Sequence, residues 1–199
     1  AVLFDWCGTL VEYPLDEDRF RPVLRRLGRP HDDAAVAELV AACGSHGVTF
    51  TFALSPGLSM RYSSQSDVDL LVAKFGQIAG LGVTSFALLL DDIPAALQHP
   101  DDVAAFDSLV DAQIALIAQL RASLTGELMV APTTYWGRGD EPYLSRLGRG
   151  IDRDIDIFFT GRAICSPVLE TVDAQRFADA TGHPPLYWDN FPVNDVAMT

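Results

Sequence analysis

Residues 85–92 read SFALLLDD, an apolar run that stops at two aspartates. A strand without polar residues is typical of a parallel sheet in which both faces are covered. An ionised carboxylate directly after such a strand is costly to bury unless it is hydrogen-bonded, paired or exposed in a cleft. The run therefore predicts a buried parallel strand over residues 85–90 and makes Asp91 and Asp92 candidates for a functional site.

Similar short strands alternate with helical periodicity along the chain from about residue 35. Strands are expected over residues 48–54, 127–131, 155–159 and 186–188; helices are expected over 35–42, 67–79 with Ser66 as N-cap, and 101–120 as one long helix. Polar residues follow the strands, where a βα barrel gathers its catalytic groups. Because an eight-stranded barrel takes about 250 residues, the 199 residues predict an α/β fold that is a partial (β/α)8 TIM-type barrel with parallel strands.

The chain is acidic, with 27 Asp and Glu against 14 Lys and Arg and a formal net charge of -13. This charge opposes binding to nucleic acid or to anionic lipid. No apolar run approaches the roughly 18 to 20 residues that cross a bilayer, so no membrane partner is expected. The cysteines at 7, 43 and 165 are odd in number and far apart, which predicts free thiols and a cytoplasmic location. The missing initiating Met predicts a fragment of a longer protein.

Asp91 and Asp92 can reach one pocket only if the strand ends there and the backbone turns, because neighbouring side chains of a strand point to opposite faces. Pro94 favours such a turn. Within one pocket, like-charge repulsion would leave one carboxylic acid and one ionised carboxylate at neutral pH, which suits glycoside chemistry. On spacing alone, a solvated pair that precedes the next helix is an equally good interpretation.

Aromatic rings occur beside amide and carboxylate groups at two other predicted strand ends, in YWG at residues 135–137 and in YWDN at 187–190. Aromatic faces pack on the apolar faces of sugar rings, while Asp and Asn bind hydroxyls with directional hydrogen bonds. For any single ring, a place in the hydrophobic core is the commoner role, and Asp195 can likewise be a simple loop residue.

Other chemistries have little support in the sequence. His31, His46, His99 and His183 have no second ligand at metal spacing, so no metal site is expected. No serine lies in a G-x-S-x-G context, Cys165 has no evident His partner, and neither G-x-G-x-x-G nor a Walker loop is present. We therefore expect neither a serine or cysteine hydrolase nor any cofactor.

Five ordered motifs carry a family resemblance. They are FALSPGL at 52–58, SFALLLDDI at 85–93, APTTY at 131–135, FTG at 159–161, and WDN at 188–190 with Asn194-Asp195. From about residue 35 to 195 the chain resembles the catalytic domain of glycoside hydrolase family 84, the β-N-acetylglucosaminidases. This resemblance favours catalysis over a structural role for the aspartate pair.

The resemblance implies retaining hydrolysis of terminal β-linked N-acetylglucosamine on a glycan or glycoprotein, with the acetamido oxygen of the substrate as nucleophile and an oxazoline intermediate. The resemblance implies that Asp91 accepts a hydrogen bond from the acetamido N–H, and that Asp92 is first the general acid and then the general base. The remaining implied contacts are Tyr135, Thr160 and Trp188 around the acetamido group, and Asn190 and Asp195 at sugar hydroxyls.

The sequence also departs from the family. The first two barrel strands of the family, with a glycine-rich turn and a substrate-binding lysine, are not found; Lys74, the only lysine, falls in a predicted helix. The last barrel strand would lie beyond Thr199. A non-catalytic carbohydrate-binding fragment is therefore the alternative to an active hydrolase.

Residues 1–30 resemble the start of a haloacid-dehalogenase-like hydrolase, through VLFDWCGTL at 2–10. Asp5 would be its phosphate-attacking residue, but Cys7 replaces the second aspartate of that motif. We predict a remnant of such a domain or a substitute strand at the sheet edge, followed by the partial barrel over residues 31–199. Phosphatase chemistry at Asp5 is a less favoured alternative.

Overall fold

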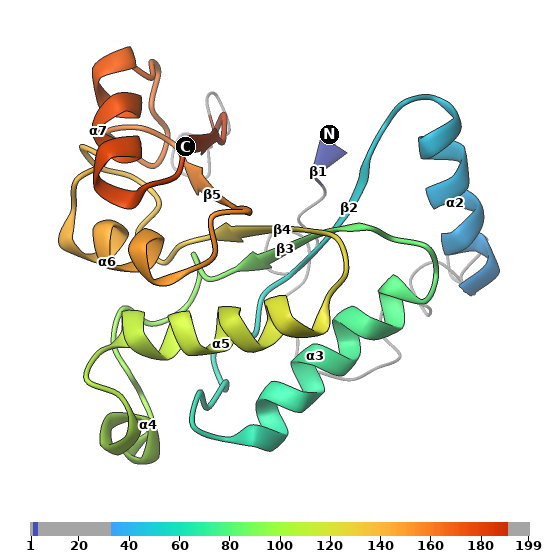
Figure 1. The fold of residues 1–199 in the computed structure, drawn as a ribbon, viewed down its shortest axis with the longest axis horizontal. Helices are drawn as coiled ribbons and strands as arrows, with labels where there is room; N and C mark the ends of the chain where they lie inside the picture. The colour runs from blue at the N-terminus through green and yellow to red at the C-terminus, as the bar shows by residue number, and fades with distance from the viewer. Residues whose placement is uncertain (1, 4–32, 191–199) are drawn as a thin grey trace, which may run out of the picture.

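The computed structural model describes residues 2–3 and 33–190 and contains a six-stranded parallel sheet (Figure 1). The strands pair in chain order. They are β1 (Val2–Leu3), β2 (Phe50–Leu54), β3 (Ser85–Leu89), β4 (Glu127–Ala131), β5 (Ile155–Phe159) and β6 (Pro185–Tyr187). Neighbouring strands that follow one another in sequence are the order of a βα barrel, so the predicted fold class is confirmed.

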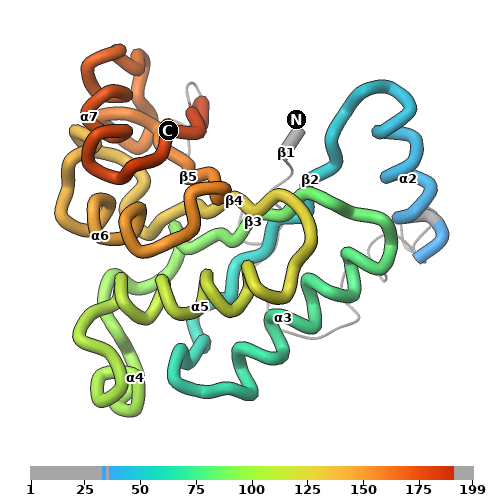
Figure 2. Tube along the Cα trace, in the orientation of Figure 1, coloured from blue at the N-terminus to red at the C-terminus, as the bar shows by residue number. Residues whose placement is uncertain are grey.

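A helix or helices connect the successive strands. They are α2 (Asp33–Ser45), α3 (Gln65–Ala79), α4 (Pro100–Ala105), α5 (Leu109–Ser123), α6 (Pro142–Gly150) and α7 (Thr171–Thr181). The chain trace in Figure 2 progresses across the sheet from blue at α2 to red at α7, with α3 and α5 together along one side of the central strands. Because all the strands are parallel, their carboxyl ends, which carry the polar residues, lie together at one edge of the sheet.

The two faces of the sheet differ in what covers them. The outer face packs on helices, and Phe86, Leu88 and Leu90 join α3 and α5 in the main core. On the inner face, Ala87 and Leu89 pack with residues of neighbouring strands. The inner cluster also contains Ala53, Met129, Ala131, Phe158, Leu186 and Trp188. In a barrel this second face lines the interior, so Ala87 and Leu89 face the inside.

Three predicted details of the helices are wrong. The helix expected over 101–120 is two helices, because Ser108 begins α5 as its N-cap and its Oγ accepts from the Asp111 N–H. The N-cap of α3 is Ser64, not Ser66, since the Ser64 side chain accepts from the Asp67 N–H. The first predicted helix is longer at both ends than residues 35–42. Lys74 lies in α3 as predicted.

Replacing Phe75 by alanine should strongly destabilise the fold. Its ring is fully buried in α3 and meets Phe52 and Phe86 edge to face, with ring centroids 5.6 and 5.9 Å away. Removing such a side chain costs about 3–5 kcal/mol through lost transfer energy and the cavity left behind. Urea unfolding of Phe75→Ala would measure the loss, with Leu70→Ala as the control on the same helix.

Leu70 is 70% exposed, so its replacement should change the free energy of unfolding by less than about 0.5 kcal/mol. Similar losses for the two variants would contradict the packing of α3 against the sheet.

None of the helices in the described ranges has both the length and the apolar character to span a bilayer. Asp5, Cys7 and Asp195 lie outside the described residues, as does most of the segment with the dehalogenase-like motif. Of that segment, Val2 and Leu3 pair in parallel with Phe50 and Thr51.

Candidate active site

Asp91 and Asp92 lie where β3 gives way to its loop. The ladder continues one residue beyond the strand, with the Leu90 N–H donating to the Ala131 carbonyl over 2.8 Å. The next two residues form a turn, in which Asp91 is half-buried and Asp92 is exposed. The predicted turn directly after a buried strand is therefore present.

Tyr135, Thr160 and Trp188 form one cluster at the same edge. The Thr160 N–H donates to the Tyr135 carbonyl over 2.9 Å, and the Trp188 N–H donates to the Phe159 carbonyl over 3.1 Å. The rings of Tyr135 and Trp188 then pack with centroids 5.4 Å apart. Main-chain bonds between the ends of β4, β5 and β6 thus bring together three residues that are far apart in sequence.

The individual side chains differ in how open they are. Trp188 is half-buried and also packs on Phe158, with centroids 5.6 Å apart. Thr160 is buried, and its hydroxyl donates to the Ala163 carbonyl over 2.8 Å. The Thr160 hydroxyl therefore holds the loop after β5, and a contact with substrate stays a prediction.

Asn190 extends this cluster toward the same loop. Its Nδ2 donates to the Ile164 carbonyl over 3.3 Å, and its N–H to the Trp188 carbonyl over 3.1 Å. Tyr187 and Trp136 are both about 40% exposed. Neither of these two rings is in the core, although a core position was the commoner expectation for a single ring.

A buried polar group supports the loop after β4. Gln113, on α5, is fully buried; its Nε2 donates to Thr133 Oγ1 over 2.8 Å, and its Oε1 accepts from the Tyr143 hydroxyl over 2.6 Å. That hydroxyl accepts from the Thr133 N–H over 3.0 Å. Burial raises the pKa of Tyr143, and raises that of the nearby Tyr62 to about 12. Both phenols therefore stay neutral hydrogen-bonding groups at physiological pH.

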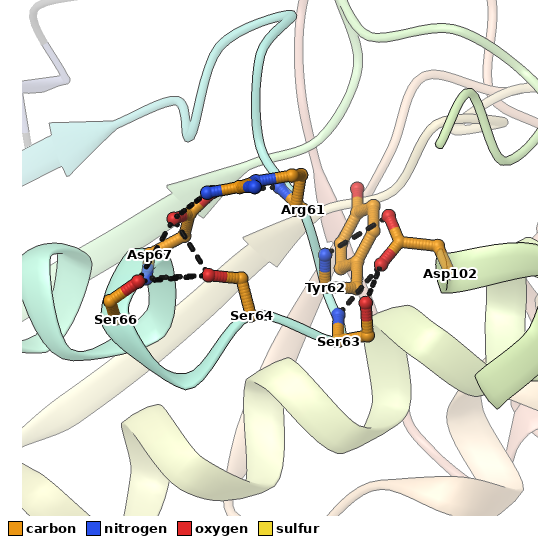
Figure 3. A network of polar contacts seen from close by, with 7 residues as sticks. All are labelled: Arg61, Tyr62, Ser63, Ser64, Ser66, Asp67 and Asp102. Atoms are coloured by element: carbon orange, nitrogen blue, oxygen red, sulfur yellow. Dashed lines mark hydrogen bonds and ion pairs between the residues drawn. The ribbon is translucent and has the colours of Figure 1, made fainter. Parts of the chain in front are cut away.

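The loop between β2 and α3 is held at two points (Figure 3). On one side, the Arg61 guanidinium donates to both carboxylate oxygens of Asp67, over 3.2 and 3.1 Å. On the other side, the buried carboxylate of Asp102 in α4 accepts from the N–H groups of Tyr62 and Ser63, over 3.1 and 2.7 Å. The second contact joins the loop after β2 to the segment that follows β3.

The Arg61–Asp67 pair predicts a component of acid sensitivity. The hydrogen bond from Arg61 lowers the pKa of Asp67 from 3.8 to about 2. A depressed folded-state pKa contributes stability above the unfolded value, and this is lost as pH falls toward the folded value. We expect Asp67→Asn to be less stable than the wild type at pH 5, with the difference shrinking between pH 4 and pH 2.

Urea unfolding of both proteins across this pH range measures the difference in the free energy of unfolding. The contributions of the other carboxylates cancel in this difference because they titrate in both proteins. The Arg61 side chain is 49% exposed, so solvent screening keeps the effect small. A difference that is the same at every pH would contradict the ionic role of Asp67.

Among the residues that the structure describes, no group of three or more His, Cys, Asp or Glu side chains is placed so that it could hold a metal ion. A hollow of about 330 Å³ lies by Gly148, Arg153 and Gly182. These residues precede β5 and β6, so this hollow is at the amino-terminal end of the strands. Because barrel enzymes react at the carboxyl-terminal end, the candidate site is the edge that carries Asp91, Asp92 and the aromatic cluster.

Residues 26–199 match the family described as beta-N-acetylglucosaminidase. The chain belongs to this family. It is 27% identical over 197 residues to protein O-GlcNAcase of Rattus norvegicus and to that of Mus musculus, an alignment covering 94% of this chain and 21% of each relative. The chain thus spans about a fifth of the length of these relatives.

Two solved structures share the fold of this family member. A mutant of the Thermobaculum terrenum O-GlcNAc hydrolase superposes with a TM-score of 0.78 at 31% identity, over 92% of this chain and 41% of that one. CpGH84B superposes with a TM-score of 0.70 at 22% identity, over 92% and 33% of the two chains. The second likeness concerns the fold alone.

Several polar residues that shape the site were not predicted. Asp102, Gln113 and Tyr143 were not singled out as functional residues. The hydrogen-bonded pairs Asp102–Tyr62 and Tyr143–Gln113 each join residues that are 30 or more positions apart in sequence. The amide of Gln113, inside the otherwise apolar buried stripe of α5, is the one local signal that could have pointed to this group.

Proposed function

We propose that this protein acts on terminal β-linked N-acetylglucosamine of a glycan or glycoprotein, as a retaining hydrolase. The observation that carries the proposal is the Asp91–Asp92 turn directly after a buried barrel strand, in a member of the β-N-acetylglucosaminidase family. The two kinds of relative, O-GlcNAcase and O-GlcNAc hydrolase, support the same substrate class. The cytoplasmic location stays a prediction.

In the proposed reaction the acetamido oxygen of the substrate attacks the anomeric carbon while the glycosidic bond breaks. Asp91, which is half-buried, accepts a hydrogen bond from the acetamido N–H and stabilises the charge that develops on the oxazoline. Asp92, which is exposed, gives its proton to the leaving oxygen and then takes one from the attacking water. Exposure suits a group that must exchange protons in each half of the reaction.

The remaining contacts would hold the sugar. The half-buried rings of Tyr135 and Trp188, already packed together, offer an apolar wall of the kind that sugar faces and acetamido methyl groups contact. The buried Thr160 would line the acetamido pocket beside these two rings, and Asn190 and Asp195 would bind sugar hydroxyls. Besides the Nδ2 hydrogen that bonds to the Ile164 carbonyl over 3.3 Å, the Asn190 amide has a second N–H donor and an Oδ1 acceptor with which it would bind a sugar hydroxyl.

Release of nitrophenol from 4-nitrophenyl N-acetyl-β-glucosaminide tests the proposal. The matched control substrate is 4-nitrophenyl β-glucoside, which has the same leaving group and no acetamido oxygen. We expect release from the first substrate only, and the first product detected by NMR should be the β-anomer. Equal turnover of both substrates would contradict participation of the acetamido group.

A non-catalytic carbohydrate-binding role is the second candidate, since the paired rings of Tyr135 and Trp188 could bind a sugar without any chemistry. Quenching or enhancement of tryptophan fluorescence by N-acetylglucosamine, saturating with concentration and reduced in Trp188→Phe, would show binding. Binding without nitrophenol release would favour this role over hydrolysis.

A further inference from the structure

Asp102 is a carboxylate in an unusually closed environment. The residue is 1% exposed and lies in α4, ten residues after Asp92. Its Oδ1 accepts from both the N–H and the hydroxyl of Ser63, over 2.7 and 2.6 Å, and its Oδ2 accepts from the Tyr62 N–H over 3.1 Å. A buried carboxylate needs such charge-assisted bonds to offset its desolvation.

All three donors belong to one loop, the connection from β2 to α3 (Figure 3). The same loop is tied to α3 on its other side by Arg61 and Asp67. The Tyr62–Ser63 segment is therefore fixed between two carboxylates, one on its own helix and one on the segment after the neighbouring strand.

The loop that Asp102 holds also lines a small hollow with the residues that follow the aspartate pair. Met60 and Tyr62 from the loop, and Ile93 and Pro94 from the other segment, surround a space of about 20 Å³. Met60 is buried in the main core, and Tyr62 and Ile93 pack against that core. A shift of the loop would thus be transmitted to the residue next to Asp92.

We propose that Asp102 is a positioning residue for the Asp91–Asp92 pair, acting through Tyr62–Ser63 and the packing of Ile93 and Pro94. The catalytic importance of this positioning role rests on the proposed function. The segment from Asp92 to Asp102 is anchored at one end by β3 and at the other by Asp102. Loosening the second anchor should therefore displace the exposed acid, and a displacement of 1 Å can cost a factor of about 10² in rate.

Asp102→Asn tests the proposal, with Asp67→Asn as the matched control on the opposite side of the same loop. We expect Asp102→Asn to lower kcat/KM for phenyl N-acetyl-β-glucosaminide by roughly 10-fold or more and for the dinitrophenyl analogue by less than ~3-fold, because only the first substrate needs a well-placed acid. Asp67→Asn should change both rates by the same small factor. Equal losses on both substrates in Asp102→Asn would overturn the positioning role.

Hydrogen–deuterium exchange gives a readout that does not depend on activity. The two variants are compared at denaturant concentrations that give them the same free energy of unfolding. Amides of residues 91–98 should then exchange faster in Asp102→Asn than in Asp67→Asn, while the exchange rates of the α5 amides should be the same in both. Ser63→Ala removes only the 2.6 Å hydrogen bond from the Ser63 hydroxyl to Asp102 and should show the same faster exchange to a smaller extent. If Asp102→Asn does not fold, faster exchange of residues 91–98 in Ser63→Ala supports the anchoring role and unchanged exchange overturns it.

The two proposals fail in different ways. If the wild type hydrolyses neither glucosaminide, the proposed function fails and the exchange data alone judge the anchoring by Asp102. Faster exchange confined to residues 91–98 then supports the anchoring, whereas unchanged or uniformly faster exchange overturns it.

Discussion

Replacing Asp92 by alanine should abolish most activity on substrates with poor leaving groups and spare activity on those with good ones. For phenyl N-acetyl-β-glucosaminide we expect kcat/KM to fall by about 10²- to 10⁴-fold, the usual contribution of a positioned proton donor. A dinitrophenolate leaves without protonation, so formation of the oxazoline from that substrate needs no acid. Initial rates on the two substrates, measured for wild type and variant, give the ratio.

Asp101→Ala is the control for this variant. Asp101 is an exposed acid in α4 on the same connection between β3 and α5. Its replacement should leave both rates unchanged. A loss in Asp92→Ala that is equal for the two leaving groups would contradict the assignment of Asp92 as the acid.

Replacing Asp91 by alanine should lower both rates by the same large factor. Every substrate must pass through the oxazoline, and the acetamido N–H becomes more acidic as that ring forms. The carboxylate therefore stabilises the transition state whatever the leaving group. Loss of one such electrostatic contact costs about 10²- to 10³-fold in kcat, and the same pair of aryl glycosides measures it.

Asp91→Asn separates charge from shape, because the amide oxygen can still accept the acetamido hydrogen bond. We expect this variant to recover part of the activity lost in Asp91→Ala. A defect confined to phenyl leaving groups would instead assign the acid role to Asp91 and exchange the two proposed functions.

Much of the fold could be predicted because its signals are local. The strands β3, β4 and β5 are short apolar runs, and each lies within one residue of its predicted bounds. Helix α3 shows the expected stripe, with Val68, Leu71 and Phe75 buried. Parallel pairing in chain order then follows from the alternation of strands and helices.

Helix ends and breaks were less predictable. Ser64 and Ser66 are both good caps in sequence, and only the backbone conformation selects Ser64, which is extended at the start of α3. The apolar period continues through residues 103–120, yet the chain leaves the helix at Phe106 and re-enters at Leu109. Side-chain periodicity does not record such a break, because the residues on either side keep the same spacing.

The parallel strands, the acids and aromatics at their carboxyl ends, and the family could all be inferred from the amino-acid sequence, since these features depend on residues close together in the chain. The packing of Tyr135 against Trp188, and the hydrogen bond from Ser63 to Asp102, 39 residues away, are visible only in the folded chain. Hydrogen bonds and ring contacts of this kind depend on the register between strands and on how loops settle against one another. No local pattern of residues encodes those distances, so only the folded chain shows which polar groups meet.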